Sequence, residues 1–242
     1  MPSESGDMKL IGNFSKLIEL ISTEPNYNPA NAKIKVPALT TQKTTALAAV
    51  ADVGAKEAPF KSVTNDRQDA YEDLPGIMSR SGNMLKASGA SQKIRDDAMT
   101  LSRKVTGRRK TAKVKNDPNT PANEATKNYS ASQLSFENVV GNFDDYIAIL
   151  ATEPSYAPNE PELTIAGLTA FSNNLKAKNA AVNTAFAAMS AARGLRDQLL
   201  YLSDDSVVNN ALLVKAYVRA ALGPASQLFK SIKGIEFKRP KK

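Results

Sequence analysis

Apolar residues recur at intervals of three and four along two stretches of the chain, one near its start and one just past its middle. This spacing follows the 3.6-residue period of an amphipathic α-helix, so each stretch is predicted to be a helix with one buried face. Both stretches end at a Thr-Glu-Pro sequence, and a residue before proline is pushed out of the helical conformation. The two stripes are Leu10, Ile11, Phe14, Leu17, Ile18 and Ile21, and Val139, Val140, Phe143, Tyr146, Ile147 and Leu150.

The second stripe repeats the first at a constant offset of 129 residues. Identical residues continue at this offset through the proline stop and into the segment that follows. A fixed offset over many identities indicates two copies of one unit. The matches include Gly-Asn-Phe at 12–14 and 141–143, Thr-Glu-Pro at 23–25 and 152–154, Tyr27 with Tyr156, Pro29 with Pro158, and Leu-Thr at 39–40 and 168–169.

Each copy continues with a proline-rich connector, a long helix and a last helix. Thr40 and Thr169 are predicted to cap the long helices, because a threonine hydroxyl accepts a hydrogen bond from a free amide at a helix start. Pro59 lies within the first long helix and is predicted to kink or break it. Gly223 and the proline after it are predicted to split or kink the last helix of the second copy.

These elements predict an all-α chain made of two tandem copies of an elongated, antiparallel three-helix bundle related by internal duplication. Copy 1 is assigned to residues 1–107 and copy 2 to residues 129–235. Residues 108–128 contain few apolar residues and two prolines, which is typical of a polar, basic linker. Residues 236–242 are predicted to form a basic C-terminal tail.

The composition removes several kinds of chemistry. Among its 242 residues the chain has no cysteine, histidine or tryptophan. It therefore lacks the commonest general base, the thiolate nucleophile and the Glu-x-x-His pairs of helical di-metal sites. We expect no enzyme activity, no cofactor, no metal and no small-molecule substrate. The first residues do not resemble a signal peptide and no apolar run could span a membrane, so we expect a cytoplasmic protein.

The net charge of +8 is concentrated in two segments, one closing each copy. Polybasic segments neutralise phosphates and release counterions, with little dependence on base sequence. They can equally meet an anionic membrane surface, or serve only as solvated tails. Only Phe237 lies nearby to stack on single-stranded bases. The candidate polyanion-binding residues are Arg103, Lys104, Arg108, Arg109, Lys110, Lys113, Lys115, Lys238, Arg239, Lys241 and Lys242.

The repeated connector has two interpretations. Its tyrosines can contact a ligand at two equivalent sites, or the connector can serve only to fold the chain, and we favour the second interpretation. Glu24 and Glu153 then need a specific partner, such as an arginine, because a carboxylate at a helix C-terminus opposes the helix dipole. The residues concerned are Glu24, Pro25, Tyr27, Pro29, Glu153, Pro154, Tyr156 and Pro158.

Arg67 and Arg196 occupy equivalent positions on the two long helices. Two interpretations are open for this pair as well. The guanidinium groups can bind an external anion, or they can form internal salt bridges with acidic residues, which we favour.

The connectors, the long helices and the closing sequence GIEFKRP at 234–240 resemble a group of uncharacterised bacterial proteins built from tandem helical units. The resemblance implies an all-α fold and no activity. Our leading hypothesis is a non-catalytic helical scaffold that can self-assemble as a homo-oligomer. The alternative is a module that binds nucleic acid or another polyanion, independently of sequence, through the basic linker and C-terminal tail.

Overall fold

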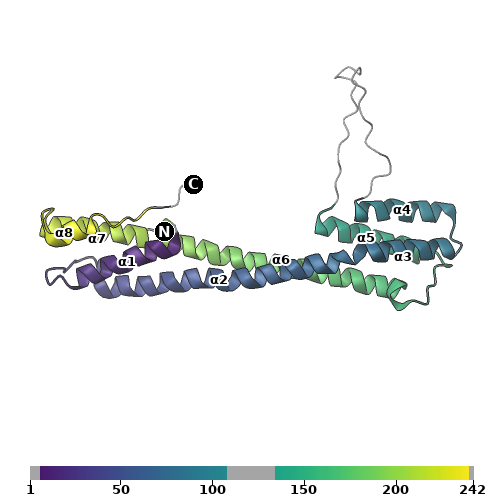
Figure 1. Cartoon of the computed structure of the whole chain (residues 1–242), viewed down its shortest axis with the longest axis horizontal. Coiled ribbons are helices and arrows are strands. Elements are labelled where there is room, and N and C mark those ends of the chain that lie inside the picture. The colour runs from purple at the N-terminus through teal and green to yellow at the C-terminus, as the bar shows by residue number, and fades with distance from the viewer. Residues whose placement is uncertain (1–5, 108–133, 240–242) are drawn as a thin grey trace, which may run out of the picture. The chain divides into compact units, whose positions relative to one another are not determined.

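The computed structural model describes residues 6–107 and 134–239, and these residues form helices with no β-strand (Figure 1). The all-α prediction is therefore confirmed for this part of the chain. The α-helices are α1 (Asp7–Ser22), α2 (Val36–Glu72), α3 (Leu74–Ala87), α4 (Gln92–Thr106), α5 (Phe136–Ala151), α6 (Ile165–Asp197), α7 (Val207–Leu222) and α8 (Gln227–Ile232). The 3-10 turns η1 (Ala32–Ile34) and η2 (Pro161–Leu163) precede α2 and α6, and a π-helical turn, η3 (Gln198–Leu202), extends α6.

The first elements of the two copies begin and end at equivalent positions. Helices α1 and α5, the turns η1 and η2, and the starts of α2 and α6 are all 129 residues apart. The stripe that predicted the first helices is buried position by position in α1 and in α5. Sequence repetition and local structure therefore agree as far as the start of each long helix.

The compact units of the structure do not follow the predicted copy boundaries. Unit 1 contains residues 1–61 and 185–242, whereas unit 2 contains residues 62–184. Each unit thus takes the first helix and the start of the long helix from one copy, and the end of the long helix and the last helices from the other copy. The physical reason is that α2 and α6 continue past the unit boundary, which places the last helices of a copy in a different unit from its first helix.

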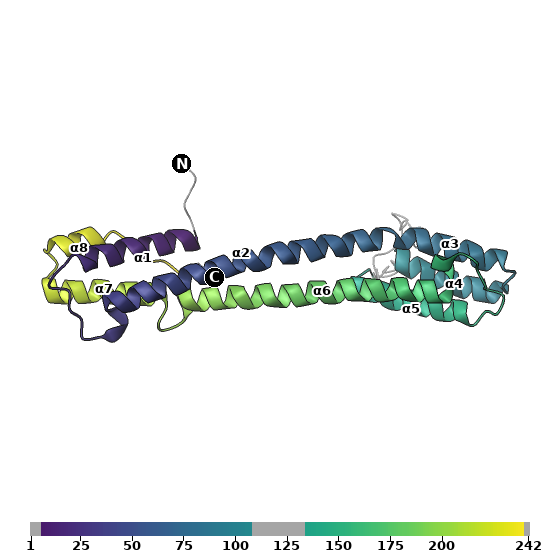
Figure 2. The same cartoon turned by 90° about the horizontal axis from the view of Figure 1, so that it is seen from below.

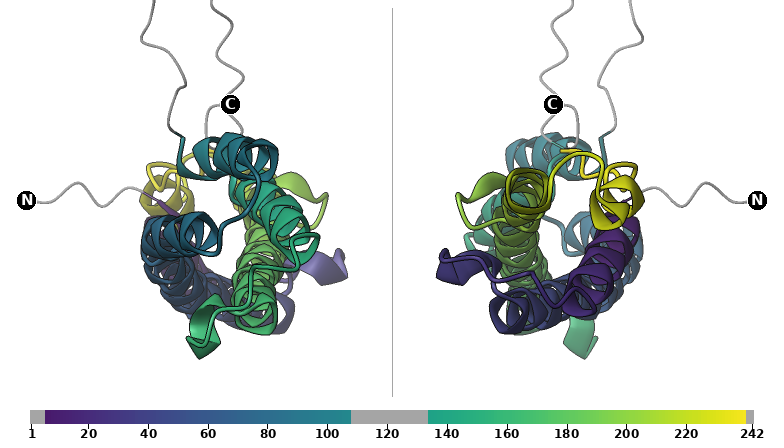
Figure 3. Two further views of the ribbon diagram at one scale, coloured as in Figure 1. Left: turned by 90° about the vertical axis from the view of Figure 1, so that its right-hand side faces the viewer. Right: turned by 90° about the vertical axis from the view of Figure 1, so that its left-hand side faces the viewer.

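In unit 1, α1 of copy 1 packs against α7 and α8 of copy 2 (Figure 3, right). Their buried side chains form one hydrophobic core. Its larger members are Leu10, Ile11, Phe14, Leu17, Ile18, Ile21, Ile34 and Leu39 from copy 1, Leu200, Tyr201, Val207, Val214, Val218, Leu228, Ile232 and Ile235 from copy 2, and Phe237 from the residues that follow copy 2.

In unit 2, α5 of copy 2 packs against α4 of copy 1, and η2 contacts α3 (Figure 3, left). The core is built in the same exchanged way. It contains Val139, Val140, Phe143, Tyr146, Ile147, Leu150, Leu168 and Leu175 from copy 2, and Leu74, Met78, Leu85 and Val105 from copy 1. Each copy therefore supplies the apolar partner for the first helix of the other.

Three predictions about the long helices were wrong. Helix α2 (Figure 2) is not broken at Pro59, which lies on an exposed face where the carbonyl left without an amide donor can meet water. Thr40 and Thr169 are not caps, because the long helices begin four residues earlier and these hydroxyls donate to the carbonyls of Val36 and Ile165. Thr164 caps α6 instead, accepting a hydrogen bond from the Gly167 amide at 3.0 Å.

Both last helices are divided. As predicted, the second copy breaks at Gly223, which has a positive φ of 83° and is followed by proline. The first copy breaks between α3 and α4 at Gly89, with a φ of 81°, and we had predicted one helix there. Only glycine adopts these conformations without strain, so the glycine at each position permits the break.

Candidate interaction surfaces

The connector tyrosines make the same hydrogen bond in both copies. The Tyr27 hydroxyl donates to the carbonyl oxygen of Ile34 at 2.6 Å, and the Tyr156 hydroxyl donates to that of Leu163 at 2.7 Å. Burial raises the pKa of both phenols, that of Tyr156 to about 12. The bond holds the connector bend against the 3-10 turn, which gives each tyrosine a role in folding.

The connector glutamates find their partners locally rather than at an arginine. Glu24 Oε1 accepts hydrogen bonds from the backbone and side-chain nitrogens of Asn26. Glu153 Oε1 accepts from the amide and hydroxyl of Ser155, at 3.2 and 2.8 Å, and these bonds lower the pKa of Glu153. The carboxylates thus stabilise the turn that follows each first helix.

Arg196 joins the two copies within unit 1. Its guanidinium lies 3.2 Å from Asp7 Oδ2, at the first position of α1, and 2.7 Å from Asp197. The Tyr201 hydroxyl, presented by the π-helical turn, donates to Asp7 Oδ1 at 2.6 Å. Burial and this bond to Asp7 raise the pKa of Tyr201. We call Asp7, Arg196 and Tyr201 the polar clamp.

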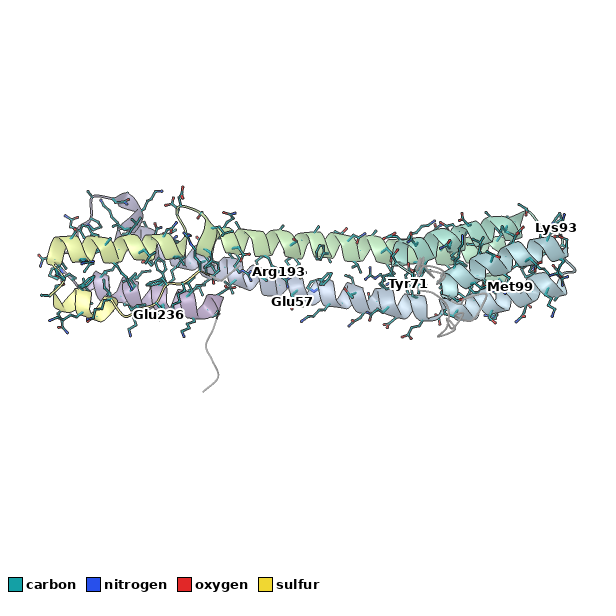
Figure 4. All side chains as sticks on the ribbon, turned by 90° about the horizontal axis from the view of Figure 1, so that it is seen from above. Glu57, Tyr71, Lys93, Met99, Arg193 and Glu236 are labelled. Atoms are coloured by element: carbon teal, nitrogen blue, oxygen red, sulfur yellow. The ribbon has the colours of Figure 1, made fainter. Side chains whose placement is uncertain are left out.

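Arg67 occupies the equivalent place in unit 2 but meets an aromatic ring. Its guanidinium carbon lies 3.9 Å from the ring centroid of Phe136, the first residue of α5. The Tyr71 ring (labelled in Figure 4) packs edge-on against Phe136 at 4.7 Å, and its hydroxyl donates to the Phe136 carbonyl oxygen at 3.0 Å. We call Phe136, Arg67 and Tyr71 the aromatic clamp. Arg196 thus forms an internal salt bridge, whereas Arg67 forms a cation–π contact.

The structure describes only four of the eleven predicted polyanion-binding residues, and it places them in different units. Arg103 and Lys104 end α4 in unit 2, where Arg103 donates to the Met99 sulfur at 2.9 Å. Lys238 and Arg239 belong to unit 1. Outside the described residues lie the predicted linker, 108–128, and Arg108, Arg109, Lys110, Lys113, Lys115, Lys241 and Lys242.

Residues 233–239, which we call the C-terminal segment, pack on unit 1 and include residues 236–239 of the predicted basic tail. Ile235 and Phe237 are buried in the core of unit 1. Asn13 of α1 donates to the Glu236 carbonyl oxygen at 2.9 Å. Arg239 donates to Asn209 Oδ1 of α7 at 2.8 Å. The apolar residues interleaved with the basic ones cause this docking, since they complete the core.

Lysines from other elements gather around this segment. The Lys215 side chain of α7 donates to the Lys233 carbonyl oxygen at 3.2 Å and lies over the Phe237 ring. Lys238, with Lys9 and Lys215 nearby, lowers the pKa of Glu236, which is labelled in Figure 4. Lys16 lies on the same face of α1 as Lys9, at a spacing of seven. We call Lys9, Lys16, Lys215, Lys238 and Arg239 the basic cluster.

Three members of the basic cluster, Lys9, Lys16 and Lys215, were missed from the sequence because each is isolated along the chain. The sequence repeat contains a signal that would have identified two of them. Copy 2 has Asn138 and Asp145 at the positions equivalent to Lys9 and Lys16. Since the same helix forms with these residues, the fold does not require lysine there.

The two units differ in charge over the described residues. Unit 1 has 15 lysines and arginines against 9 acidic residues, whereas unit 2 has 9 against 12. Within the described part, no group of acidic side chains could hold a metal ion and no helix is long and apolar enough to cross a membrane. Comparison with protein-family models, curated proteins and solved structures finds no match.

Proposed function

We propose that the chain is a non-catalytic helical scaffold, formed by internal duplication, in which two copies complete each other's bundles. The observation that supports this proposal is the exchange of last helices. Helix α1 of copy 1 packs on α7 and α8 of copy 2, and α5 of copy 2 packs on α4 of copy 1. The buried contacts described above are structural, and the residue types that most often do catalysis, His and Cys, are absent from the sequence.

A thiol crosslink tests this exchange directly, because the chain has no native cysteine. Asn210 Nδ2 donates to Gln42 Oε1 at 3.0 Å, and these residues belong to different copies. Gln42→Cys with Asn210→Cys should be joined within one molecule by a short bifunctional thiol reagent. Gln42→Cys with Met99→Cys is the matched control, since Met99 belongs to unit 2. Crosslinking of the control alone would overturn the exchanged arrangement.

Self-assembly, the second part of this proposal, is tested by molar mass in solution. A scaffold that forms a homo-oligomer should exceed the 26.0 kDa of one chain as concentration rises. A mass that stays at one chain over the whole range would remove this part. We further propose a cytoplasmic location and membership of the bacterial tandem helical proteins that the sequence resembles.

Polyanion binding is the second candidate function, and the basic cluster of unit 1 favours it. Two of its five cations lie at positions where the other copy has a neutral or an acidic residue, so folding alone does not explain them. Binding through phosphates should weaken steeply with salt, roughly tenfold or more between 50 and 200 mM for several contacts. Lys9→Gln with Lys238→Gln and Arg239→Gln should reduce both the affinity and the salt dependence.

The matched control neutralises Lys86 and Lys93, exposed lysines of unit 2 that are not among the candidate polyanion-binding residues. A chain that is retained neither on DNA nor on anionic vesicles at low salt would eliminate this second function.

A further inference from the structure

The exposed large apolar side chains gather in unit 1. Within the described residues, Met8, Leu47, Phe186, Leu195, Leu202, Leu212 and Leu213 belong to unit 1, whereas unit 2 has only Met99 and Leu134. Exposed apolar groups that collect on one part of a protein mark a binding surface more often than the same groups scattered singly.

Helix α7 is apolar on both of its sides. Its inner face, with Val207, Val214 and Val218, is buried in the core of unit 1. Its outer face holds Leu212 and Leu213, with 48% and 43% of their surface exposed, and the exposed residues Ala216 and Ala220.

Helix α3 follows α2 as α7 follows α6, and it provides an internal comparison in unit 2. Its exposed positions include Ser79, Arg80, Asn83 and Lys86. The fold at this place is therefore compatible with a polar outer face, and the leucines of α7 are not needed for it.

Basic side chains frame this apolar face. Arg219 is exposed two turns after Leu212, and Lys215 lies between them at a spacing of three from Leu212. Arg239 is held on Asn209, one turn before Leu212 and Leu213, with Lys238 beside it in the chain. The face thus combines leucines with cations from two elements.

We infer that the outer face of α7, with the end of the C-terminal segment, is a docking surface for an anionic lipid bilayer. This inference rests on the polyanion binding proposed above and names its partner. Leucines can enter the boundary between headgroups and acyl chains while the cations remain among the anionic headgroups.

Two other partners fit the face less well. Nucleic-acid phosphates attract the cations but gain nothing from exposed leucines. A specific protein interface covers about 800 Å² per partner, and two half-exposed leucines supply only a small fraction of that area. A bilayer requires no such shape complementarity.

The test is flotation of the full chain with phosphatidylcholine vesicles, with and without phosphatidylserine, beside duplex DNA at the same salt. Leu212→Ser with Leu213→Ser should lower partitioning onto phosphatidylserine vesicles about tenfold or more and leave DNA affinity unchanged. Arg219→Gln with Arg239→Gln should lower partitioning onto these vesicles to a similar degree.

Met99→Ser, an exposed apolar position of unit 2, is the matched control and should leave both affinities unchanged. Circular dichroism checks that each variant is folded. Undiminished vesicle binding by the double serine variant overturns the lipid inference, as does DNA binding without vesicle binding, although polyanion binding then stands. Failure to bind either partner removes both proposals.

Discussion

The polar clamp and the aromatic clamp join equivalent elements of the two units by different kinds of interaction. In both units, an arginine and a tyrosine near the end of one copy's long helix contact the first residue of the other copy's first helix. That residue is Asp7 in unit 1, where it receives an ion pair and a hydrogen bond. It is Phe136 in unit 2, where it receives a cation–π contact and an edge-on ring. The contact between the end of one long helix and the start of the other copy's first helix therefore occurs in both units. The type of interaction that makes this contact differs between them.

The surfaces of the two units differ in the same way. Several surface positions that hold lysines or exposed leucines in unit 1 hold acidic or polar residues at the equivalent places in unit 2. Since both versions form the same first helix and connector, folding of these elements does not require either set of surface residues.

Cutting the chain between its copies gives the largest expected effect on this comparison. A protease site inserted within residues 108–133 allows the backbone between the two copies to be cut in the folded protein. If both units are built by exchange, the fragments should remain together at about the mass of the intact chain, 26.0 kDa, by light scattering. Separation into two folded fragments at neutral pH would mean that each copy folds on itself.

Phe14 and Phe143 are equivalent core residues, one in each unit, and both are fully buried. Replacing either with alanine should lower the free energy of unfolding by about 3–5 kcal/mol. The loss should be larger for Phe143, by about 0.5–1.5 kcal/mol, because its ring also packs against Tyr146 and Phe171. Urea unfolding of both variants measures the difference, and equal losses would show that these ring contacts add nothing.

Gly167 and Ala38 are equivalent residues in the first turns of α6 and α2. A Cβ atom at Gly167 would overlap the carbonyl oxygen of Pro161, so Gly167→Ala should cost about 1–3 kcal/mol by displacing η2. The reciprocal change, Ala38→Gly, should cost only about 0.5–1 kcal/mol. Thermal unfolding ranks the two variants, and a neutral Gly167→Ala would show that η2 yields without cost.

Salt should distinguish the two clamps. Asp7→Asn removes a partly exposed ion pair and should cost about 1 kcal/mol at low salt, falling as salt approaches about 1 M. Phe136→Leu removes ring contacts and should cost about 1 kcal/mol at any salt concentration. Urea unfolding at both salt concentrations tests this pair, and parallel responses would contradict the assignment of the clamps.

The smallest expected effect is a loss of unfolding free energy at alkaline pH, compared between Tyr27 and Tyr156. Because burial raises their pKa values above the ordinary value of 10.0, the unfolded chain loses these protons first. Their contribution to stability is therefore complete below pH 10.0 and declines as pH rises, until about 12 for Tyr156. Tyr156→Phe and Tyr27→Phe should each flatten this decline. An unchanged slope of unfolding free energy against pH would contradict it.

The sequence was sufficient for much of the local structure but not for the pairing of helices. The stripes of α1 and α5, the proline stops and the break at Gly223 follow from period and backbone chemistry. The exchange does not, because both copies carry the same kind of apolar stripe and either can serve as partner. The continuation of α2 through Pro59 was also missed, because the exposure of that face of the helix is known only from the fold.

The basic cluster was only partly predictable for a related reason. Lys238 and Arg239 stand out as a charged run, but Ile235 and Phe237 beside them are the residues that dock the segment. Lys9 and Lys215 join the cluster only through contacts between elements that are distant in the chain. Counting charges along the sequence cannot show that these residues lie close together in the fold.

The exchange of helices has a consequence for how such a chain could diversify. A molecule with a single copy could build these units only by pairing with a second, identical molecule, and its two units would then have to carry the same mutations. With both repeats in one chain, that obligation does not apply. Lys9 and Lys16 of one repeat can lie at positions where the other has Asn138 and Asp145, so each unit carries its own surface residues.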